Sequence, residues 1–327
     1  MKLRSALGGI FAALMAMAFG DPAQAADYPN RPVKLIVPYQ PGGQADVGIR
    51  LIAPQLQALL GQPFVVVNIP GSSGVAAMST ALNAPADGYT ISYADAGHWA
   101  INSALHSNLS YDPEKDFVPI GLFGETTGLF IAVTDALPVK TLQELIALAK
   151  AKPGALTYGS AGVGSIHHLI MEDFKAGVGV DILHIPYKGS TQTLPALLSG
   201  EISMAIASLG SVSNYVEQGK VRLLAVSTKK RSPLAPDVPT IAELAIPDFD
   251  HAGAEGLIAR TGTPQEVVDK LSAALGKIVV MPDVASRFLG FGLVPITDTS
   301  PKLMAETIRT DREKYARVVK ISGAKAE

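Results

Sequence analysis

The 327-residue chain has no cysteine, few aromatic residues and few charged residues. Because cysteine is absent, disulfides and thiolate metal sites are excluded, and the hydrophobic core alone must hold the fold together. Aromatic side chains make up 6% of the residues and charged side chains 17%, against 48% hydrophobic residues. This composition is typical of a soluble globular protein.

Hydrophobic runs long enough to cross a membrane are also lacking. A shorter hydrophobic run near the start of the chain predicts export. The basic residues Lys2 and Arg4 precede an apolar run from Ala6 to Phe19, which is too short to span a bilayer. Ala23-Gln24-Ala25 then supplies a cleavage signal, so we expect residues 1–25 to be a signal peptide. The alternative is a retained membrane anchor, although a Gly-Asp-Pro sequence interrupts the run.

Neither sign of charge dominates the mature chain. Without the first 25 residues, 25 basic residues stand against 28 acidic ones. This balance argues against nucleic acid or an anionic membrane surface as the partner. The remaining chain of about 300 residues exceeds one comfortable hydrophobic core, so we expect two domains.

The most informative stretch is a strand, a glycine turn and a helix near the start of the mature chain. The apolar run Val33 to Val37 predicts a buried strand, and Pro41-Gly42-Gly43 ends it. Apolar residues between Ile49 and Leu60 then recur at helical spacing. Backbone N–H groups at such a helix N-terminus point at an anion. A plain connecting turn is the alternative, since such turns are common in α/β proteins.

The same order of strand, turn and helix recurs along the chain. Strands are predicted at 33–37, 64–68, 89–94, 156–161, 180–187, 202–207 and 221–227. Strands that alternate with helices imply a parallel sheet, with ligands held at the carboxyl ends of the strands. The apolar stretches 117–124 and 128–134 have no helix between them, and we interpret them as the first crossing between domains.

These elements predict an α/β fold of two lobes, each a mainly parallel sheet flanked by helices, with two hinge crossings. Residues 26–126 and 228–327 are expected to form the first domain. Residues 127–227 are expected to form a second domain inserted into it. This is the organisation of bilobal receptors that close about a hinge.

Sequence motifs for catalysis, phosphate binding and metal binding are absent. No serine has glycine at both −2 and +2, and the Gly-Lys pairs at 219–220 and 276–277 lack the rest of a phosphate loop. Gly162-x-Gly164 lacks the third glycine of a dinucleotide fingerprint. His167 and His168 are adjacent, so they cannot both face one ion from a helix. We predict no catalytic residue, no metal site and no cofactor.

What remains is one glycine turn in each lobe, Pro41-Gly42-Gly43 and Gly162-Val163-Gly164-Ser165, and neither contains Arg or Lys. If both following helices direct free N–H groups into a cleft, together they can hold a carboxylate without a cationic side chain. A helix terminus contributes about 0.3–1 kcal/mol, or up to ~2 when partly buried. Each hydrogen bond to a charged group adds about 1.5–3 kcal/mol, which is sufficient for micromolar binding.

A series of short motifs runs in order through the mature chain. They are Tyr28-Pro29-x-Arg31-Pro32, Val37-Pro38-Tyr39-Gln40-Pro41-Gly42-Gly43-x-x-Asp46, Leu60-Gly61-Gln62-Pro63, Asn68-x-Pro70-Gly71, Pro85-Ala86-Asp87-Gly88-Tyr89-Thr90, Ala100-Ile101-Asn102, Tyr111-Asp112-Pro113-x-x-Asp116-Phe117, 147–154, Ser160-Ala161-Gly162-x-Gly164, His184-Ile185-Pro186-Tyr187-Lys188-Gly189, Leu198-x-Gly200 and Asp237-Val238-Pro239-Thr240. In this order they resemble the extracytoplasmic solute receptors of the tripartite tricarboxylate transporter family, also called Bug receptors. The resemblance covers essentially the whole mature chain.

The resemblance implies a two-lobed periplasmic binding protein of type II. It would close on a small carboxylate in the periplasm and deliver it to a permease with a large and a small integral subunit. Carried over, the ligand-binding residues are Tyr39, Gln40, Gly42, Gly43 and Asp46 in the first lobe and Ser160, Gly162, Gly164, Ser165 and His168 in the second. We interpret Asp46 as a brace for the turn, because a carboxylate repels an anionic solute. His168 is either a ligand contact or a core histidine.

The chain departs from the family pattern at two places. Asp95-Ala96-Gly97-His98 stands where small or hydroxyl residues are usual, and Ala252-Gly253-Ala254-Glu255 stands where an aromatic residue is common. We expect His98, Glu255 and Ser208 to read the far end of the ligand, with ordinary loop polarity as the alternative for each. If Glu255 faces the cleft, a ligand with an amine or hydroxyl donor is favoured over a simple dicarboxylate.

Two other functions stay open from the sequence. A sensor with the same fold would present its closed form to a signalling partner. An exported enzyme on a similar scaffold would use His98 and Asp95 as its acid–base pair. We expect a monomer whose partners are the solute and the permease.

Overall fold

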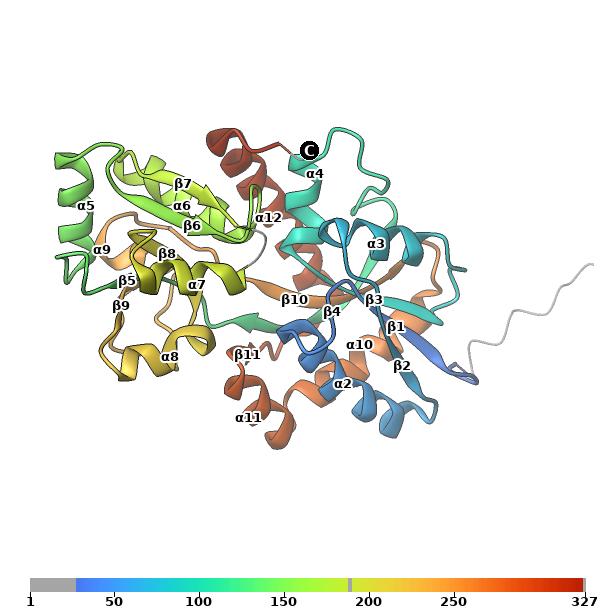
Figure 1. Cartoon of the computed structure of the whole chain (residues 1–327). Helices are drawn as coiled ribbons and strands as arrows, with labels where there is room; N and C mark the ends of the chain where they lie inside the picture. The colour runs from blue at the N-terminus through green and yellow to red at the C-terminus, as the bar shows by residue number, and fades with distance from the viewer. Residues whose placement is uncertain (1–27, 188–189, 326–327) are drawn as a thin grey trace, which may run out of the picture.

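The computed structural model describes residues 28–187 and 190–325. The predicted signal peptide, residues 1–25, lies outside the described residues, as do Lys188 and Gly189. The described chain forms two lobes side by side, each a β-sheet with helices on both faces (Figure 1). The predicted α/β class and two-lobed architecture are therefore confirmed.

The first lobe is built on a six-stranded sheet of order β11-β4-β10-β3-β1-β2, as far as the chain is described. Its strands are β1 (Val33–Val37), β2 (Phe64–Asn68), β3 (Thr90–Asp95), β4 (Phe117–Thr126), β10 (Ala254–Arg260) and β11 (Leu293–Pro295). Its helical segments are α2 (Gln44–Leu60), η1 (Ser72–Gly74), α3 (Val75–Leu82), η2 (Gly97–Ile101), α4 (Asn102–Leu105), α10 (Gln265–Val279), α11 (Pro282–Gly290) and α12 (Pro301–Ser322). Helices α2, α10 and α11 cover one face, and α3, η2 and α12 cover the other.

The second lobe is built on a five-stranded sheet of order β7-β6-β8-β5-β9, again within the described residues. Its strands are β5 (Leu129–Thr134), β6 (Thr157–Ser160), β7 (Leu183–Pro186), β8 (Met204–Ser208) and β9 (Val221–Val226). Its helices are α5 (Leu142–Ala151), α6 (Ile166–Val178), α7 (Ser190–Ser199), α8 (Leu209–Glu217) and α9 (Ile241–Leu244). Helices α5, α6 and α9 pack on one face, and α7 and α8 pack on the other.

Helix α2 shows how the apolar pattern builds these layers. Ile49, Ile52 and Leu56 lie on one face of the helix and are fully buried against the first sheet. Each such burial stabilises the fold by about 1.5–3 kcal/mol. Gly61, with φ of +80°, ends the helix in the left-handed conformation that glycine favours. The amphipathic spacing therefore fixes which face of α2 packs on the first sheet.

Both sheets are mixed, which corrects the expectation of mainly parallel sheets. Strands β2, β1 and β3 are parallel in the first lobe, as are β7, β6 and β8 in the second. Strand β10 is antiparallel to β3 and β4, and β5 is antiparallel to β8 and β9. The reason is the path of the chain: β4 and β5 carry it toward the second lobe, and β9 and β10 bring it back.

The return to the first lobe comes later than the sequence suggested. Residues 228–250, expected in the first lobe, pack on the second: Ile241 and Phe249 lie in its hydrophobic core. Thr240 also forms a parallel bridge with Val226, next to the end of β9. The chain therefore returns between His251 and the start of β10, whereas the outward crossing lies between β4 and β5.

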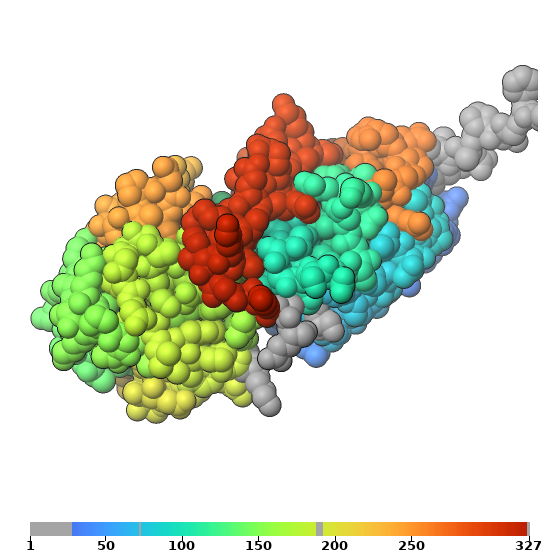
Figure 2. Space-filling model, turned by 90° about the horizontal axis from the view of Figure 1, so that it is seen from above, coloured from blue at the N-terminus to red at the C-terminus, as the bar shows by residue number. Residues whose placement is uncertain are grey.

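Helix α12 lies at the junction of the lobes (Figure 2). It packs against β4, η2 and α4 of the first lobe and against α6 of the second. Leu169 of α6 shares a hydrophobic cluster with Tyr315 and Val318 of α12. No helix within residues 28–187 and 190–325 is long and apolar enough to cross a membrane.

Candidate functional site

The first-lobe turn, between β1 and α2, is held in shape by a buried aspartate. Gly42 has φ of +85°, and its N–H donates to Asp46 Oδ2 at 2.8 Å. Asp46 also accepts hydrogen bonds from Arg50 and from Asn68. Burial raises the pKa of Asp46, but the hydrogen bonds from Arg50, Gly42 and Asn68 outweigh it and hold the pKa below its usual value. Asp46 therefore braces the turn, as predicted.

The second-lobe turn, between β6 and α6, uses the same device. Gly164 has φ of +76°, and its N–H donates to Nδ1 of His168, four residues later. Ser165 caps α6, since its Oγ accepts from the N–H of His168 at 3.3 Å. His168 is 4% exposed, and its ring stacks on His184 with centroids 4.1 Å apart. His168 is thus a buried brace for the turn, which agrees with the core-histidine alternative of the sequence.

The hydroxyl of Ser160, at the end of β6, stabilises this turn by hydrogen bonding. Its Oγ accepts from the N–H of Gly162 at 3.1 Å and lies 2.6 Å from Nε2 of His184. Ser160 is fully buried. The Oγ of Ser165 donates to the carbonyl of Gly162 at 2.7 Å. The amides of Gly42, Gly162 and Gly164 are therefore all used inside the turns, which corrects the expectation that these glycines contact the ligand through their N–H groups.

The free donors lie beside those glycines, at the starts of the two helices. In the first lobe the amides of Gly43, Gln44 and Ala45 donate to no group in the described part of the chain. In the second lobe the same holds, within the described residues, for the amides of Ile166 and His167. Free N–H groups at helix N-termini favour anions. Each lobe thus offers an anion site made of backbone.

A second polar group lies at the carboxyl end of β3, around Asp95. Its Oδ2 accepts from the hydroxyls of Tyr39 at 2.6 Å and Tyr93 at 3.2 Å. Its Oδ1 accepts from the N–H of Gly97 at 2.9 Å and lies 2.8 Å from Nδ1 of His98. Burial raises the pKa of Asp95, but His98, Tyr39 and Gly97 together hold it below its usual value. Asp95 is therefore an ionised carboxylate, a role that the sequence did not assign.

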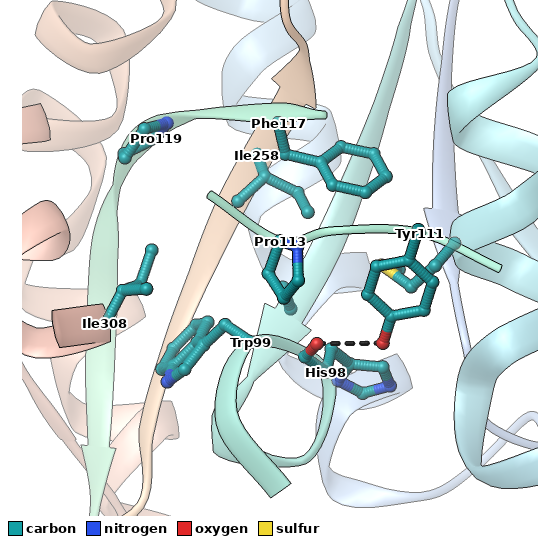
Figure 3. Close-up of a pocket in the computed structure, with 10 residues that line it drawn as sticks. His98, Trp99, Tyr111, Pro113, Phe117, Pro119, Ile258 and Ile308 are labelled. Atoms are coloured by element: carbon teal, nitrogen blue, oxygen red, sulfur yellow. Dashed lines mark hydrogen bonds between the residues drawn. The ribbon is translucent and has the colours of Figure 1, made fainter. Parts of the chain in front are cut away.

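His98 contacts the carboxylate of Asp95, and its predicted role at the far end of the ligand stays a prediction. It is 2% exposed, and its Nε2 has no hydrogen-bond partner among the described residues. Tyr111 donates to the carbonyl of His98 at 2.8 Å (Figure 3). With Trp99 and other side chains these residues line a cavity of about 10 Å³, which holds at most one water molecule. This cavity is therefore too small for an organic solute.

Glu255 stands opposite Asp95 on the neighbouring strand β10. It is 4% exposed, and its Oε2 has no hydrogen-bond partner in the described part of the chain. Burial, together with the charge of Asp95, raises the pKa of Glu255 to about 8. Glu255 is therefore a buried carboxyl group with an unused oxygen.

A pocket of about 340 Å³ lies beside the second-lobe turn, and Ser208 is part of its wall. His167, Thr193, Leu194 and Ser211 line it as well. Burial lowers the pKa of His167 to about 4, so the ring is neutral at pH 7. The family resemblance pointed to His168, whereas His167 is the histidine that lines this pocket.

The described residues contain no cluster of three His, Asp or Glu side chains suited to a metal ion.

Two lobes, hinge crossings and paired helix N-termini define a class of protein, the two-lobed α/β solute-binding proteins.

Comparison with known proteins places the chain within this class. The model for the tripartite tricarboxylate transporter family receptor matches residues 49–323. The chain is 33% identical to protein BugT of Bordetella pertussis over 318 residues, which is 97% of this chain and 96% of BugT. The chain belongs to the tripartite tricarboxylate transporter receptor family.

Solved structures agree with this assignment. The structure of R. palustris Rpa4515 with adipate has a TM-score of 0.79 and 34% identity, and the match covers 91% of this chain and 99% of that chain. MatC from Rhodopseudomonas palustris with bound malate has a TM-score of 0.75 and 28% identity, with coverage of 89% and 100%. The family and these neighbours are binding receptors, not enzymes.

Proposed function

We propose that this protein is a periplasmic receptor that captures a small organic carboxylate between its lobes by hinge closure. It then delivers the solute to a membrane permease made of one large and one small integral subunit. The receptor reaches the periplasm by a cleaved signal peptide, residues 1–25, and works as a monomer without a cofactor or catalytic residue.

The observation that supports the proposal most strongly is the free amides at the starts of α2 and α6. Both sets follow a glycine turn that is braced four residues later, by Asp46 in one lobe and by His168 in the other. Neither turn contains a cationic side chain. Backbone amides recognise the carboxylate and nothing beyond it, so the same two turns can hold many organic acids.

The two solved structures with bound carboxylates are consistent with a site that recognises only the carboxylate group. Adipate in Rpa4515 and malate in MatC are both dicarboxylates, but their carbon chains differ in length and substitution. We therefore assign the shared carboxylate to the two turns, with Gly43, Gln44 and Ala45 in one and Ile166 and His167 in the other. Gln40 remains a proposed contact of this site, and Ser208 remains a proposed contact of the far end of the solute.

Thermal stability of the mature chain, residues 26–327, tests this proposal. The protein is unfolded and refolded to remove co-purified solute, then mixed with dicarboxylates, amino acids and aromatic acids. A carboxylate at 100 times its Kd stabilises the fold by about 2.7 kcal/mol, so we expect Tm to rise by about 5 °C. The corresponding neutral amides are the control. An unchanged Tm across the panel at millimolar concentration would contradict the proposal.

A further inference from the structure

Two acidic side chains oppose each other at one end of the neighbouring inner strands β3 and β10. Glu255, near the start of β10, is in register with Asp95 at the end of β3. Side chains at opposed positions lie on the same face, with Cβ atoms about 5 Å apart, and like charges there destabilise the sheet. One of these two charges must therefore be neutralised by a proton or by a cation.

The two carboxyl groups differ in how their oxygens are used. Asp95 accepts hydrogen bonds from Tyr39, Tyr93 and Gly97, so both of its oxygens are occupied. Glu255 is buried to the same depth as the core, yet its Oε2 has no partner among the described residues. A buried polar atom without a partner costs about 1–3 kcal/mol. Such an atom indicates a missing donor.

The hydroxyl of Tyr93 hydrogen-bonds Glu255, yet Oε2 is left without a partner among the described residues. The groups that face the pair are Tyr39 from the turn after β1, Tyr93 from β3 and His98 from η2. No lysine or arginine in the described residues acts appreciably on either carboxyl. Tyr39 is 38% exposed and the side chain of Asp95 is 20% exposed, so solvent reaches the Asp95 side of the pair, with Glu255 buried beside it.

We propose that Glu255 and Asp95 form a subsite for an ammonium group, so that the solute is a carboxylate that also carries an amino group. This inference rests on the proposed function, in which the two turns hold the carboxylate end. The ammonium donates to Oε2 of Glu255 and takes the place of the proton that otherwise neutralises one of the two carboxylates.

A second carboxylate is the competing occupant of this subsite. It would require a proton on Glu255, and the raised pKa of about 8 allows one at neutral pH. However, the neighbouring Asp95 is ionised and would repel a carboxylate in a poorly solvated place. The geometry of the pair therefore favours a cation over a second anion.

Affinities for matched pairs of compounds test the inference. The pairs are succinate with 4-aminobutanoate, glutarate with 5-aminopentanoate, and adipate with 6-aminohexanoate, each titrated into the refolded mature chain by calorimetry. Within at least one pair we expect the amino member to bind ten times more tightly or better. Tighter binding of the dicarboxylate in every pair that binds would overturn the inference and leave the proposed carboxylate receptor standing.

Two variants separate the subsite from general charge effects. Glu255→Gln removes the charge and keeps the shape, so the preference for the amino member should fall at least tenfold. Glu125→Gln is the control, because Glu125 lies on the adjacent strand β4 and removes the same charge without touching the pair. An unchanged preference in Glu255→Gln, with wild-type stability, would contradict the inference.

The proton balance of binding gives an independent readout. At pH 7 Glu255 is mostly protonated, and an ammonium in the subsite ionises it, so about one proton should be released on binding. Titrations in two buffers with different ionisation enthalpies measure this number. Release should vanish in Glu255→Gln. Proton uptake, or no change, on binding an amino compound would overturn the inference. If no carboxylate in either panel binds, the proposed function fails and the inference fails with it.

Discussion

Gln44 occupies the first position of α2, and its backbone N–H is one of the free donors in the first lobe. Proline is well tolerated at this position of a helix, where its missing N–H costs no intrahelical bond. Gly43 before it has φ of −73° and ψ of 167°, an extended conformation that suits a residue preceding proline. The donor can therefore be deleted with little change in the fold.

We predict that Gln44→Pro binds the carboxylate about 10–100 times more weakly than Gln44→Ala, the loss expected for one hydrogen bond to a charged group. Gln44→Ala lacks the same side chain but keeps the amide, so it is the matched control. Titration calorimetry with the best compound of the panel measures both. Equal affinities in the two variants would show that this amide does not hold the solute.

At the residue scale the sequence predicted the two glycine turns but not which of their backbone amides are free. The glycine turns and the bracing role of Asp46 followed from residue types. Two facts did not follow: His168 takes the amide of Gly164, and His98 lies under Asp95. Both depend on side-chain rotamers and on which neighbour accepts a hydrogen bond, and such information is not contained in spacing alone.

At the scale of elements, α6, α12 and the return crossing are joined by one buried carboxylate. Asp173 of α6 accepts from Arg317 of α12 at 2.7 Å and lies 2.9 Å from Nε2 of His251 in the crossing segment. Asp173 and His251 are buried, whereas the side chain of Arg317 is 56% exposed. The network thus fixes a second-lobe helix to a first-lobe helix beside the hinge.

We predict that Asp173→Asn lowers the free energy of unfolding by about 1.5–3 kcal/mol, because a buried carboxylate loses its hydrogen bonds with Arg317 and His251. Arg317→Ala should lower it by about 1 kcal/mol or less, since this partner is partly solvated. Glu313→Gln on the same helix, in an exposed pair with Arg309, is the control and should change it by less than about 0.5 kcal/mol. Urea unfolding measures all three. Equal losses for Asp173→Asn and Glu313→Gln would contradict this account of the junction.

The same variant has a predicted pH dependence. Burial raises the pKa of Asp173, but hydrogen bonds from His251 and Arg317 outweigh it and hold the pKa below the usual 3.8. A carboxylate with a lowered folded pKa stabilises the fold above its unfolded pKa, and this stability is lost as pH falls through the folded pKa. The gap between wild type and Asp173→Asn should therefore be constant near neutral pH and shrink below about pH 4.

The elements themselves followed from periodicity, but their directions did not. All seven strands that the sequence predicted with turns and helices are present, with ends shifted by a few residues. The expectation of mainly parallel sheets was wrong at β10 and β5, because an apolar strand has the same residue pattern in a parallel and in an antiparallel pair. The register of β10 then decided that Glu255 faces Asp95.

At the scale of the whole molecule, the two lobes and the outward crossing could be expected from the sequence, but the return crossing could not. Residues 228–250 are rich in proline and charge, so they resemble a surface loop. Within the described residues of this segment, Ile241 and Phe249 are the buried members of the second-lobe core, and two such residues are too few to assign the segment by pattern. The hinge is therefore formed partly by a segment near His251 that the sequence placed wholly in the first lobe.

The central claim is that both lobes hold one carboxylate, and small-angle X-ray scattering tests it most directly. Scattering is recorded from the refolded mature chain alone and with a saturating amount of the tightest carboxylate from the panel. We predict that the radius of gyration falls on binding, because the carboxylate completes its contacts only when the amides of α2 and α6 come together. Tight binding with no change in the radius of gyration would place the solute on a single lobe and contradict the account.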